Sequence, residues 1–395
     1  MKLRDRRFQG KIILALTLVH FTGDFYNSFI TPLLPAFTER FSLTLTEVGI
    51  LSGLGRFLAF VIQPSVGYFA DHYRTRLFIL GGTLLSVVCI PLAGIVPSFA
   101  VLLGCVALGS IGSAMFHPSV AGMIPLYSGS RPGFSMSFFN TGGTLAFAAG
   151  PVLITWFVGK YGLSATPLTM VPGLLLFFLI AAVVPLPEGE GLAKNGFLGT
   201  LKESFGEVWR AILLLWVVMV LRAFVAHCFR TFFPLLLDRE GFSLLAIGTV
   251  VSLFTLAGTI SGLIAGALSD RMGFRKIFYV AHGLATPVLL LFLFAHGAGV
   301  YPMACLSGFL IMATLPLGVT LAQELAPKGR SMVSSLMMGF AFGLGGMMTP
   351  IAGALADRFT IRGVLSVVAL LPLLTTALIP WMTERERDRR GVSAG

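Results

Sequence analysis

The stretch GALSDRMGFR, residues 266–275, decides the fold because the similar stretch GYFADHYRTR occupies residues 67–76. Both open with a glycine and carry an aspartate four residues later, at Asp270 and Asp71, about 200 residues apart. A second pair with nearly the same offset is FITPLLPAFTERFSL at 29–43 and TFFPLLLDREGFSL at 231–244. Such an internal duplication indicates two similar halves, and it is typical of membrane transporters.

The composition places these halves in a membrane. The 395 residues are 56% hydrophobic and 11% charged, whereas soluble domains carry about 25% charged residues. A spanning helix needs about 20 mostly apolar residues, and twelve such runs are present. They lie near 12–36, 47–69, 77–96, 99–126, 133–158, 164–186, 209–236, 244–268, 276–296, 300–325, 331–356 and 361–382. We therefore expect an all-α membrane protein with twelve transmembrane helices in two pseudo-symmetric six-helix bundles.

The longest polar interruption, PEGEGLAKNGFLGTLKESFGEVWR at 187–210, divides the runs six and six. It predicts a first bundle over 1–186, a cytoplasmic linker over 187–208 and a second bundle with a short tail over 209–395. If the N-terminus is cytoplasmic, the inner segments hold 20 Lys and Arg residues and the outer segments hold 5. This asymmetry predicts both termini in the cytoplasm, as for a bacterial inner-membrane protein. The orientation of the protein in the membrane thus explains the net charge of +11, and no binding to nucleic acid is expected.

The two repeated loops resemble the cytoplasmic loop motif of the major facilitator superfamily. In that family the glycine allows close helix packing, and the aspartate caps a helix and engages neighbouring basic residues. The resemblance therefore implies conformational roles for Gly67, Asp71, Gly266, Asp270, Arg271 and Arg275. The first copy departs from the motif, with His72 in place of the usual arginine. GGTLAFAAGP at 142–151 resembles the glycine-proline motif of antiporter members, which adds Gly150 and Pro151 to this set.

A narrower resemblance is to the fosmidomycin-resistance subfamily of drug exporters. The stretches that carry it are GDFYN at 23–27, QPSVGYFADHY at 63–73, FHPSVAG at 116–122, AQELAP at 322–327 and GFAFGLGG at 339–346. The resemblance implies drug efflux but does not name the substrate, since such subfamilies contain many untested members.

Charged residues inside the apolar runs are the candidates for function, because a charge at mid-bilayer costs about 2.5–3.5 kcal/mol. Asp24 lies in the first run and Arg56 in the second, and antiparallel helices bring them to nearly the same level. One interpretation is a permanent ion pair that only fixes packing. The other is that Asp24 carries the coupling proton and that substrate changes its proton affinity by displacing Arg56.

The seventh run supplies Arg222 and His227. Arg56 and Arg222 come from opposite halves, so together they predict a positively charged central cavity for an anionic or zwitterionic substrate. Arginine binds carboxylate or phosphonate through its planar set of donors. The further candidates for substrate contact are Phe25, Tyr26, Phe224, Asn140 and His227; for the aromatic residues and Asn140, contacts with lipid or neighbouring helices are the alternative.

The pair His117–Pro118 lies in the fourth run. Pro118 cannot donate a main-chain hydrogen bond, so it frees the carbonyl of Ala114 and predicts a bend in a gating helix. Two interpretations of His117 stand. Its imidazole is either structural, bonded to a carbonyl or hydroxyl, or part of the cavity as a proton relay or substrate ligand.

The sequence lacks a phosphate-binding glycine loop with its lysine and lacks HExxH. We therefore expect no enzyme activity, no cofactor and no metal ligand, and we expect transport driven by an ion gradient. The predicted function is a proton-coupled antiporter, monomeric, that exports a small anionic or amphipathic compound by alternating access. The alternatives are a proton symporter or facilitator that imports an organic anion, and a transport-inactive sensor or scaffold.

Overall fold

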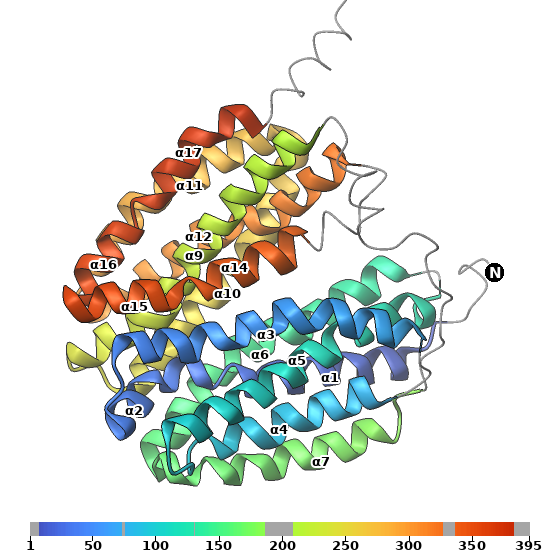
Figure 1. Ribbon diagram of the computed structural model, residues 1–395. Helices are drawn as coiled ribbons and strands as arrows, with labels where there is room; N and C mark the ends of the chain where they lie inside the picture. The colour runs from blue at the N-terminus through green and yellow to red at the C-terminus, as the bar shows by residue number, and fades with distance from the viewer. Residues whose placement is uncertain (1–7, 73–75, 130, 186–207, 327–335, 383–395) are drawn as a thin grey trace, which may run out of the picture. The chain divides into compact units, whose positions relative to one another are not determined.

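The computed structural model describes residues 8–72, 76–129, 131–185, 208–326 and 336–382 (Figure 1). Within these ranges every regular element is a helix, which confirms the all-α prediction. The helices form two compact units. Unit 1 comprises Met1–Leu192 with Pro234–Ser252, and unit 2 comprises Ala193–Phe233 with Leu253–Gly395. Only the last residue of the predicted linker, residue 208, falls within the described ranges.

Unit 1 consists mainly of the helices that lie before the linker. They are α1 (Gly10–Asn27), α2 (Ile30–Phe41), α3 (Leu45–His72), the π-helical turn Leu77–Gly81, α4 (Gly82–Leu92), α5 (Phe99–Tyr127), α6 (Pro132–Tyr161), the 3-10 turn Leu163–Thr169 and α7 (Met170–Ala181). Helix α1 packs against α4, α5, α6 and α7, and α5 packs against α3 and α4 (Figure 1).

Most of unit 2 is formed by the helices that follow the linker. They are α9 (Trp209–Arg239), α10 (Leu244–Met272), α11 (Phe274–Leu293), the 3-10 turn Gly297–Gly299, α12 (Val300–Leu325), the π-helical turn Leu336–Phe340, α14 (Ala341–Met347), α15 (Thr349–Arg358), α16 (Ile361–Val368) and α17 (Leu371–Met382). The end of α9 and the start of α10 are grouped with unit 1.

Nine helical stretches of the described residues are long and apolar enough to cross a membrane. The other three predicted runs are present as shorter helices. The run 77–96 contains the helical stretch Leu77–Leu92, and 331–356 contains a π-helical turn, α14 and α15.

The run 12–36 is not one helix, as the sequence predicted, but two. It is interrupted between Asn27 and Ile30, where Pro32 cannot donate to the carbonyl of Ser28 and its ring crowds that carbonyl. The interruption places the end of α1 just after Asp24.

The described surface is apolar. Leu263 is 75% exposed, Leu179 69% and Phe178 67%. The interior contains, besides apolar side chains, serine and threonine hydroxyls. Most of these donate to a carbonyl three or four residues earlier, as Thr17 does to Ile13 and Thr83 does to Ile79. Polar residues inside and large apolar residues outside are the pattern of a protein whose solvent is lipid. The protein is therefore a multi-pass membrane protein.

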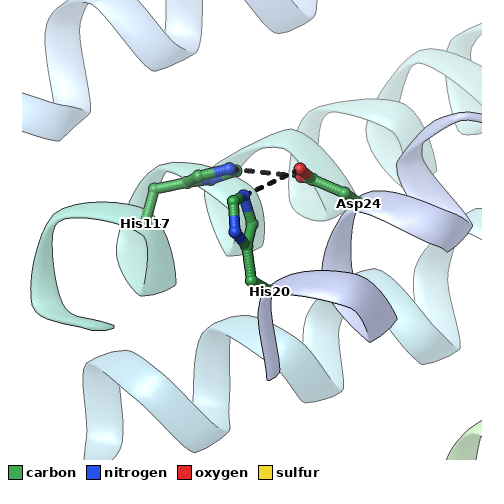
Figure 2. Close-up of side chains that lie close together, drawn as sticks. All are labelled: His20, Asp24 and His117. Atoms are coloured by element: carbon green, nitrogen blue, oxygen red, sulfur yellow. Dashed lines mark ion pairs between the residues drawn. The ribbon is translucent and has the colours of Figure 1, made fainter. Parts of the chain in front are cut away.

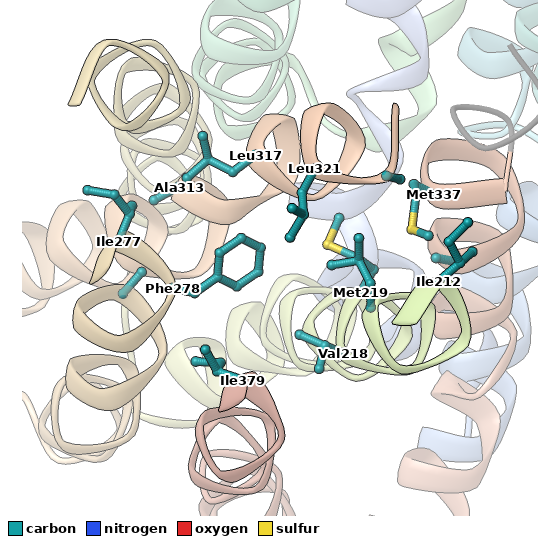
Figure 3. Packing of buried hydrophobic residues seen from close by; sticks show 14 of the residues in the cluster. Ile212, Val218, Met219, Ile277, Phe278, Ala313, Leu317, Leu321, Met337 and Ile379 are labelled. Atoms are coloured by element: carbon teal, nitrogen blue, oxygen red, sulfur yellow. The ribbon is translucent and has the colours of Figure 1, made fainter. Parts of the chain in front are cut away.

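Each unit has its own packed core. In unit 2, Met219 of α9, Phe278 of α11 and Leu321 of α12 are fully or almost fully buried in one cluster with Ile379 of α17 (Figure 3). In unit 1 the cluster includes Leu16 and Val19 of α1, Phe116 of α5 and Phe139 of α6. Helices in lipid associate through such close packing rather than through the hydrophobic effect. Two residues of the unit 1 cluster, Phe116 and Phe139, also pack against the ring of His20 on α1.

Candidate functional site

Helix α1 presents two titratable side chains toward the interior of unit 1. His20 and Asp24 are four residues apart, so they share one face of the helix. Nε2 of His20 lies 3.1 Å from Oδ2 of Asp24. Both are buried, with Asp24 only 3% exposed. A carboxylate this deep needs partners, since burying an isolated charge is costly.

Helix α5 supplies the third member of the cluster. Nε2 of His117 lies 3.2 Å from Oδ1 of Asp24, so the two histidines approach different oxygens of one carboxylate (Figure 2). The other ring nitrogen of His117 lies 2.8 Å from the main-chain oxygen of Ser113 and 3.1 Å from its hydroxyl. One ring nitrogen of His117 thus makes a local bond within α5, and the other faces the carboxylate of Asp24. Helix α5 runs without interruption through Pro118.

Close packing from α5 and α6 holds His20 in place. Its Nδ1 lies 3.0 Å from the main-chain oxygen of Phe139, and its ring stacks on the Phe139 ring with centroids 4.2 Å apart. Gly143, one turn further along α6, leaves the space that His20 occupies. A Cβ at residue 143 would lie 2.5 Å from Nε2 of His20 and 3.0 Å from Oδ2 of Asp24. Gly150 similarly admits Ser28 and the end of α1.

Arg56 on α3 is the cation that the sequence placed beside Asp24. Its charge interacts with both Asp24 and His117. Two more side chains, the histidines, lie at ion-pair distance from the carboxylate. We call His20, Asp24 and His117 the His–Asp–His cluster. Arg56 is not counted in this cluster but is its neighbouring positive charge.

The donor atoms of the His–Asp–His cluster lie within 4.8 Å of one another, a spread that a metal ion could draw together. Their present spacing suits protons better. The two nitrogen–oxygen distances, 3.1 and 3.2 Å, lie within the range of N–H···O hydrogen bonds, so each contact can hold one proton. A proton fills each contact without any rearrangement of the side chains, and we treat the cluster as a proton site for this reason.

His20 is not among the residues predicted from the sequence. A signal for it was present, because His20 lies one helical turn before Asp24 and hence on the same face. The contacts to α5 and α6 could not be read from the sequence, since they depend on how three helices pack.

Arg222 of α9 is buried in unit 2, at 3% exposed. One terminal nitrogen lies 3.4 Å from the main-chain oxygen of Ile311 and 3.7 Å from the sulfur of Met312, both on α12. Its Nε has no hydrogen-bond partner among the described residues. A buried guanidinium with weak contacts has unused capacity to bind an anion. Arg222 and Arg56 belong to different units, and each is described within its own.

The other residues predicted to contact substrate differ in their burial and in their contacts. Tyr26 is buried and its hydroxyl donates to the main-chain oxygen of Thr169 at 2.5 Å, so its polar end serves the packing of unit 1. Phe25 is half-buried and stacks on Phe21 with centroids 5.6 Å apart. Asn140 is exposed on α6. In unit 2, Phe224 and His227 are buried, and the His227 ring lies 4.4 Å from the ring of Phe342.

The repeated loop motif is described only in part. The side chains of Asp71 and Asp270 lie outside the described residues, as does the environment of Gly67. A Cβ at Gly266 would meet no described atom within 4 Å. Arg271 is exposed, and the guanidinium of Arg275 lies 5.6 Å from the ring centre of Tyr279.

The turn between α10 and α11 explains the second glycine of GALSDRMGFR. Gly273 has a φ of 78°, a left-handed conformation that side chains other than glycine rarely adopt. It separates α10, which ends at Met272, from α11, which begins at Phe274. The motif therefore contains the residue that ends one helix and permits the next to begin immediately.

Two helical units with apolar surfaces, one with a buried titratable cluster and the other with a buried arginine, are typical of membrane transporters. A family model described as Major Facilitator Superfamily matches residues 16–350. The chain belongs to this superfamily and has its twelve-helix fold. Members of the superfamily carry small molecules across membranes, so this protein is a secondary transporter.

Named relatives agree with this assignment. The chain is 27% identical to the fosmidomycin resistance protein of Escherichia coli strain K12 over 388 residues, which are 95% of this chain and 94% of the relative. It is 27% identical over 373 residues to the uncharacterized MFS-type transporter YfnC of Bacillus subtilis strain 168, covering 92% and 90%. The resemblance to the fosmidomycin-resistance proteins is thereby confirmed.

A solved structure gives the same fold. It is a bacterial homologue of the human lysosomal transporter Spinster in an inward-facing and occupied conformation, with a TM-score of 0.82 and 15% identity. The match covers 95% of this chain and 97% of that one. At this level of identity the likeness concerns the fold alone.

Proposed function

We propose that this protein is a proton-coupled antiporter that exports a small anionic or amphipathic compound by alternating access. It would act as a monomer in the inner membrane, with both termini in the cytoplasm. The observation that carries the proposal is the buried Asp24 between His20 and His117. Three titratable groups inside membrane-spanning helices are costly, and such groups commonly mark a proton pathway.

The substrate class is inferred from the cations of the two units. Arg222 is buried with an unpartnered Nε, and a phosphonate or carboxylate would supply the acceptors that it lacks. The relative named for fosmidomycin resistance supports the same class, since fosmidomycin is a phosphonate. Phe25 and Phe224 are candidates for holding the apolar part of an amphipathic substrate.

Symport is the second candidate, and one observation favours it. Arg56 interacts electrostatically with Asp24, so an anion that neutralises Arg56 would strengthen proton binding at Asp24 rather than weaken it. Direct electrostatic coupling of this kind favours binding of proton and anion together. Antiport therefore requires that proton and substrate favour opposite-facing conformations of the transporter.

Proteoliposomes with an imposed pH gradient test both candidates. Saturable flux of phosphonates, including fosmidomycin, or of carboxylates is expected against the direction of the proton gradient. Flux in the same direction as the protons would establish symport instead, and saturable flux of cationic drugs alone would refute the anion assignment.

The variant Asp24→Asn is expected to bind substrate but to lose its response to the pH gradient. Glu39→Gln, which changes an exposed carboxylate on α2, is the matched control and should respond as the wild type does. If the Asp24→Asn variant still transported substrate in response to the pH gradient, Asp24 would not be the coupling residue.

A further inference from the structure

The hydrogen bonds on the outer side of each histidine fix where its ring proton lies. Nδ1 of His20 is 3.0 Å from the main-chain oxygen of Phe139. Nδ1 of His117 is 2.8 Å from the main-chain oxygen of Ser113, nearer than the Ser113 hydroxyl at 3.1 Å. A carbonyl oxygen can only accept, so both Nδ1 atoms carry a hydrogen and donate it. In a neutral imidazole the remaining nitrogen, Nε2, then presents a lone pair.

Both lone pairs point at the same carboxylate. Nε2 of His20 is 3.1 Å from Oδ2 of Asp24, and Nε2 of His117 is 3.2 Å from Oδ1 (Figure 2). A lone pair that faces an ionised oxygen is repulsive, and one proton in each contact makes it attractive. A single proton can satisfy only one contact, because the contacts use different oxygens.

We propose that the His–Asp–His cluster binds two exchangeable protons, one in each nitrogen–oxygen contact, and that the second proton binds in the contact between His20 and Asp24. The cluster then has three states, with net charges of −1, 0 and +1 for zero, one and two protons. The proposal deepens the proposed function, on which its role in transport rests, because a cycle that empties the cluster would exchange two protons. Proton binding itself requires no substrate and can be measured independently.

Exposure sets the order in which the contacts exchange. The side chain of His117 is 29% exposed, whereas those of His20 and Asp24 are 10% and 4% exposed. The ring of His20 is covered by the stacked ring of Phe139, and Gly143 packs against its Nε2. A proton therefore reaches His117 first and passes from its Nε2 to Oδ1 of Asp24. Rotation of the carboxyl group then presents the protonated oxygen to Nε2 of His20, which takes the proton and leaves the carboxylate ionised.

The neighbouring charges separate the two steps. Within the described residues, the charged or titratable groups that act on Asp24 are His20 on its own helix, His117 on α5 and Arg56 on α3. The doubly protonated cluster is positive and lies beside the positive Arg56, so the second proton binds more weakly than the first. Two interacting sites of this kind titrate in two macroscopic steps.

Nitrogen-15 NMR of the histidine-labelled, full-length protein in micelles tests this inference without substrate. The expected spectrum shows Nδ1 of His20 and His117 protonated throughout, and Nε2 of the two rings gaining protons in separate pH ranges. Assignment uses His20→Gln and His117→Gln, since glutamine retains a donor and an acceptor. Each single variant is expected to retain one of the two steps, and Asp24→Asn to abolish their coupling.

Two histidines of the same molecule serve as references. His296 is exposed, and His282 is buried between the hydroxyls of Thr375 and Thr314; an unchanged His282 signal shows that a variant remains folded.

Three results would refute the two-proton site. The first is a single titration step shared by His20 and His117, and the second is a hydrogen on Nε2 with a bare Nδ1 in either ring. The third is binding of one equivalent of Zn²⁺ to chelator-treated protein with a shift of both Nε2 signals, at a pH where both protons are expected to be bound. The cluster would then be a metal site. None of these results bears on whether the protein transports anions, which the flux measurements decide.

Discussion

Gly143 of α6 lies directly against His20 of α1, so close that a Cβ at residue 143 would stand 2.5 Å from Nε2 of the imidazole. The same Cβ would lie 3.0 Å from Oδ2 of Asp24. The glycine therefore determines whether His20 and Asp24 can meet. It belongs to GGTLAFAAGP, the stretch whose resemblance to antiporter members was noted in the sequence.

Replacement of Gly143 by alanine should displace His20 from Asp24. We expect a less stable protein that has lost its response to a pH gradient, because the methyl group blocks the contact. Loss of a buried polar contact costs about 1–3 kcal/mol, which exceeds the gain of about 0.5–1 kcal/mol from placing alanine in the helix. Gly159→Ala on the same helix is the matched control, since a Cβ there meets nothing within 4 Å. Equal gradient-driven flux in the two variants would show that the His20–Asp24 contact is not needed for coupling.

Arg222→Met should stabilise the protein while weakening anion binding. The variant replaces a buried guanidinium that has weak contacts to Ile311 and Met312 with an apolar chain of similar length. Replacing buried charges by packed apolar groups is often neutral or stabilising, by about 1–4 kcal/mol. Thermal unfolding in micelles and equilibrium binding of a phosphonate measure the two effects. A lower melting temperature with unchanged binding would assign Arg222 a structural role.

Tyr26→Phe distinguishes a packing role from a substrate contact. The hydroxyl donates to the main-chain oxygen of Thr169, which is half-buried, and loss of this hydrogen bond costs about 0.5–1.5 kcal/mol. We expect a lower melting temperature with unchanged transport specificity. A changed order of preference among phosphonates and carboxylates would restore Tyr26 to the substrate site.

The membrane fold could be predicted almost completely from the sequence, because twelve apolar runs and an internal repeat leave few alternatives. The break between α1 and α2 was missed although Pro32 signals it, since a proline in the first turn of a helix also occurs where a run is continuous. Apolar length alone does not show where a run divides.

The candidate site was predicted only in part. Asp24, Arg56 and His117 were selected because charge and proline are conspicuous in apolar runs. His20 was passed over, and its role depends on Phe139 and on the space left by a glycine, which only the packing of three helices reveals. A residue's chemistry can be read from the sequence, whereas its partners in other helices cannot.

His282 shows that a buried histidine need not carry an exchangeable proton. The hydroxyl of Thr375 donates to the main-chain oxygen of Pro372 at 2.8 Å, so it accepts from Nδ1 of His282 at 2.7 Å. Nε2 then accepts from the hydroxyl of Thr314 at 2.9 Å. Both nitrogens are satisfied by one ring proton, in contrast to the two histidines that face Asp24.

Thr314→Val should therefore destabilise unit 2 without altering proton coupling. The variant keeps the shape of the side chain but leaves Nε2 of His282 without a donor, at a cost of about 1–3 kcal/mol. We expect a lower melting temperature in micelles and an unchanged response of transport to the pH gradient. Thr320→Val, an exposed threonine on the same helix that bonds only to the carbonyl of Pro316, is the control. A pH response that changes with Thr314 would place His282 in the proton pathway.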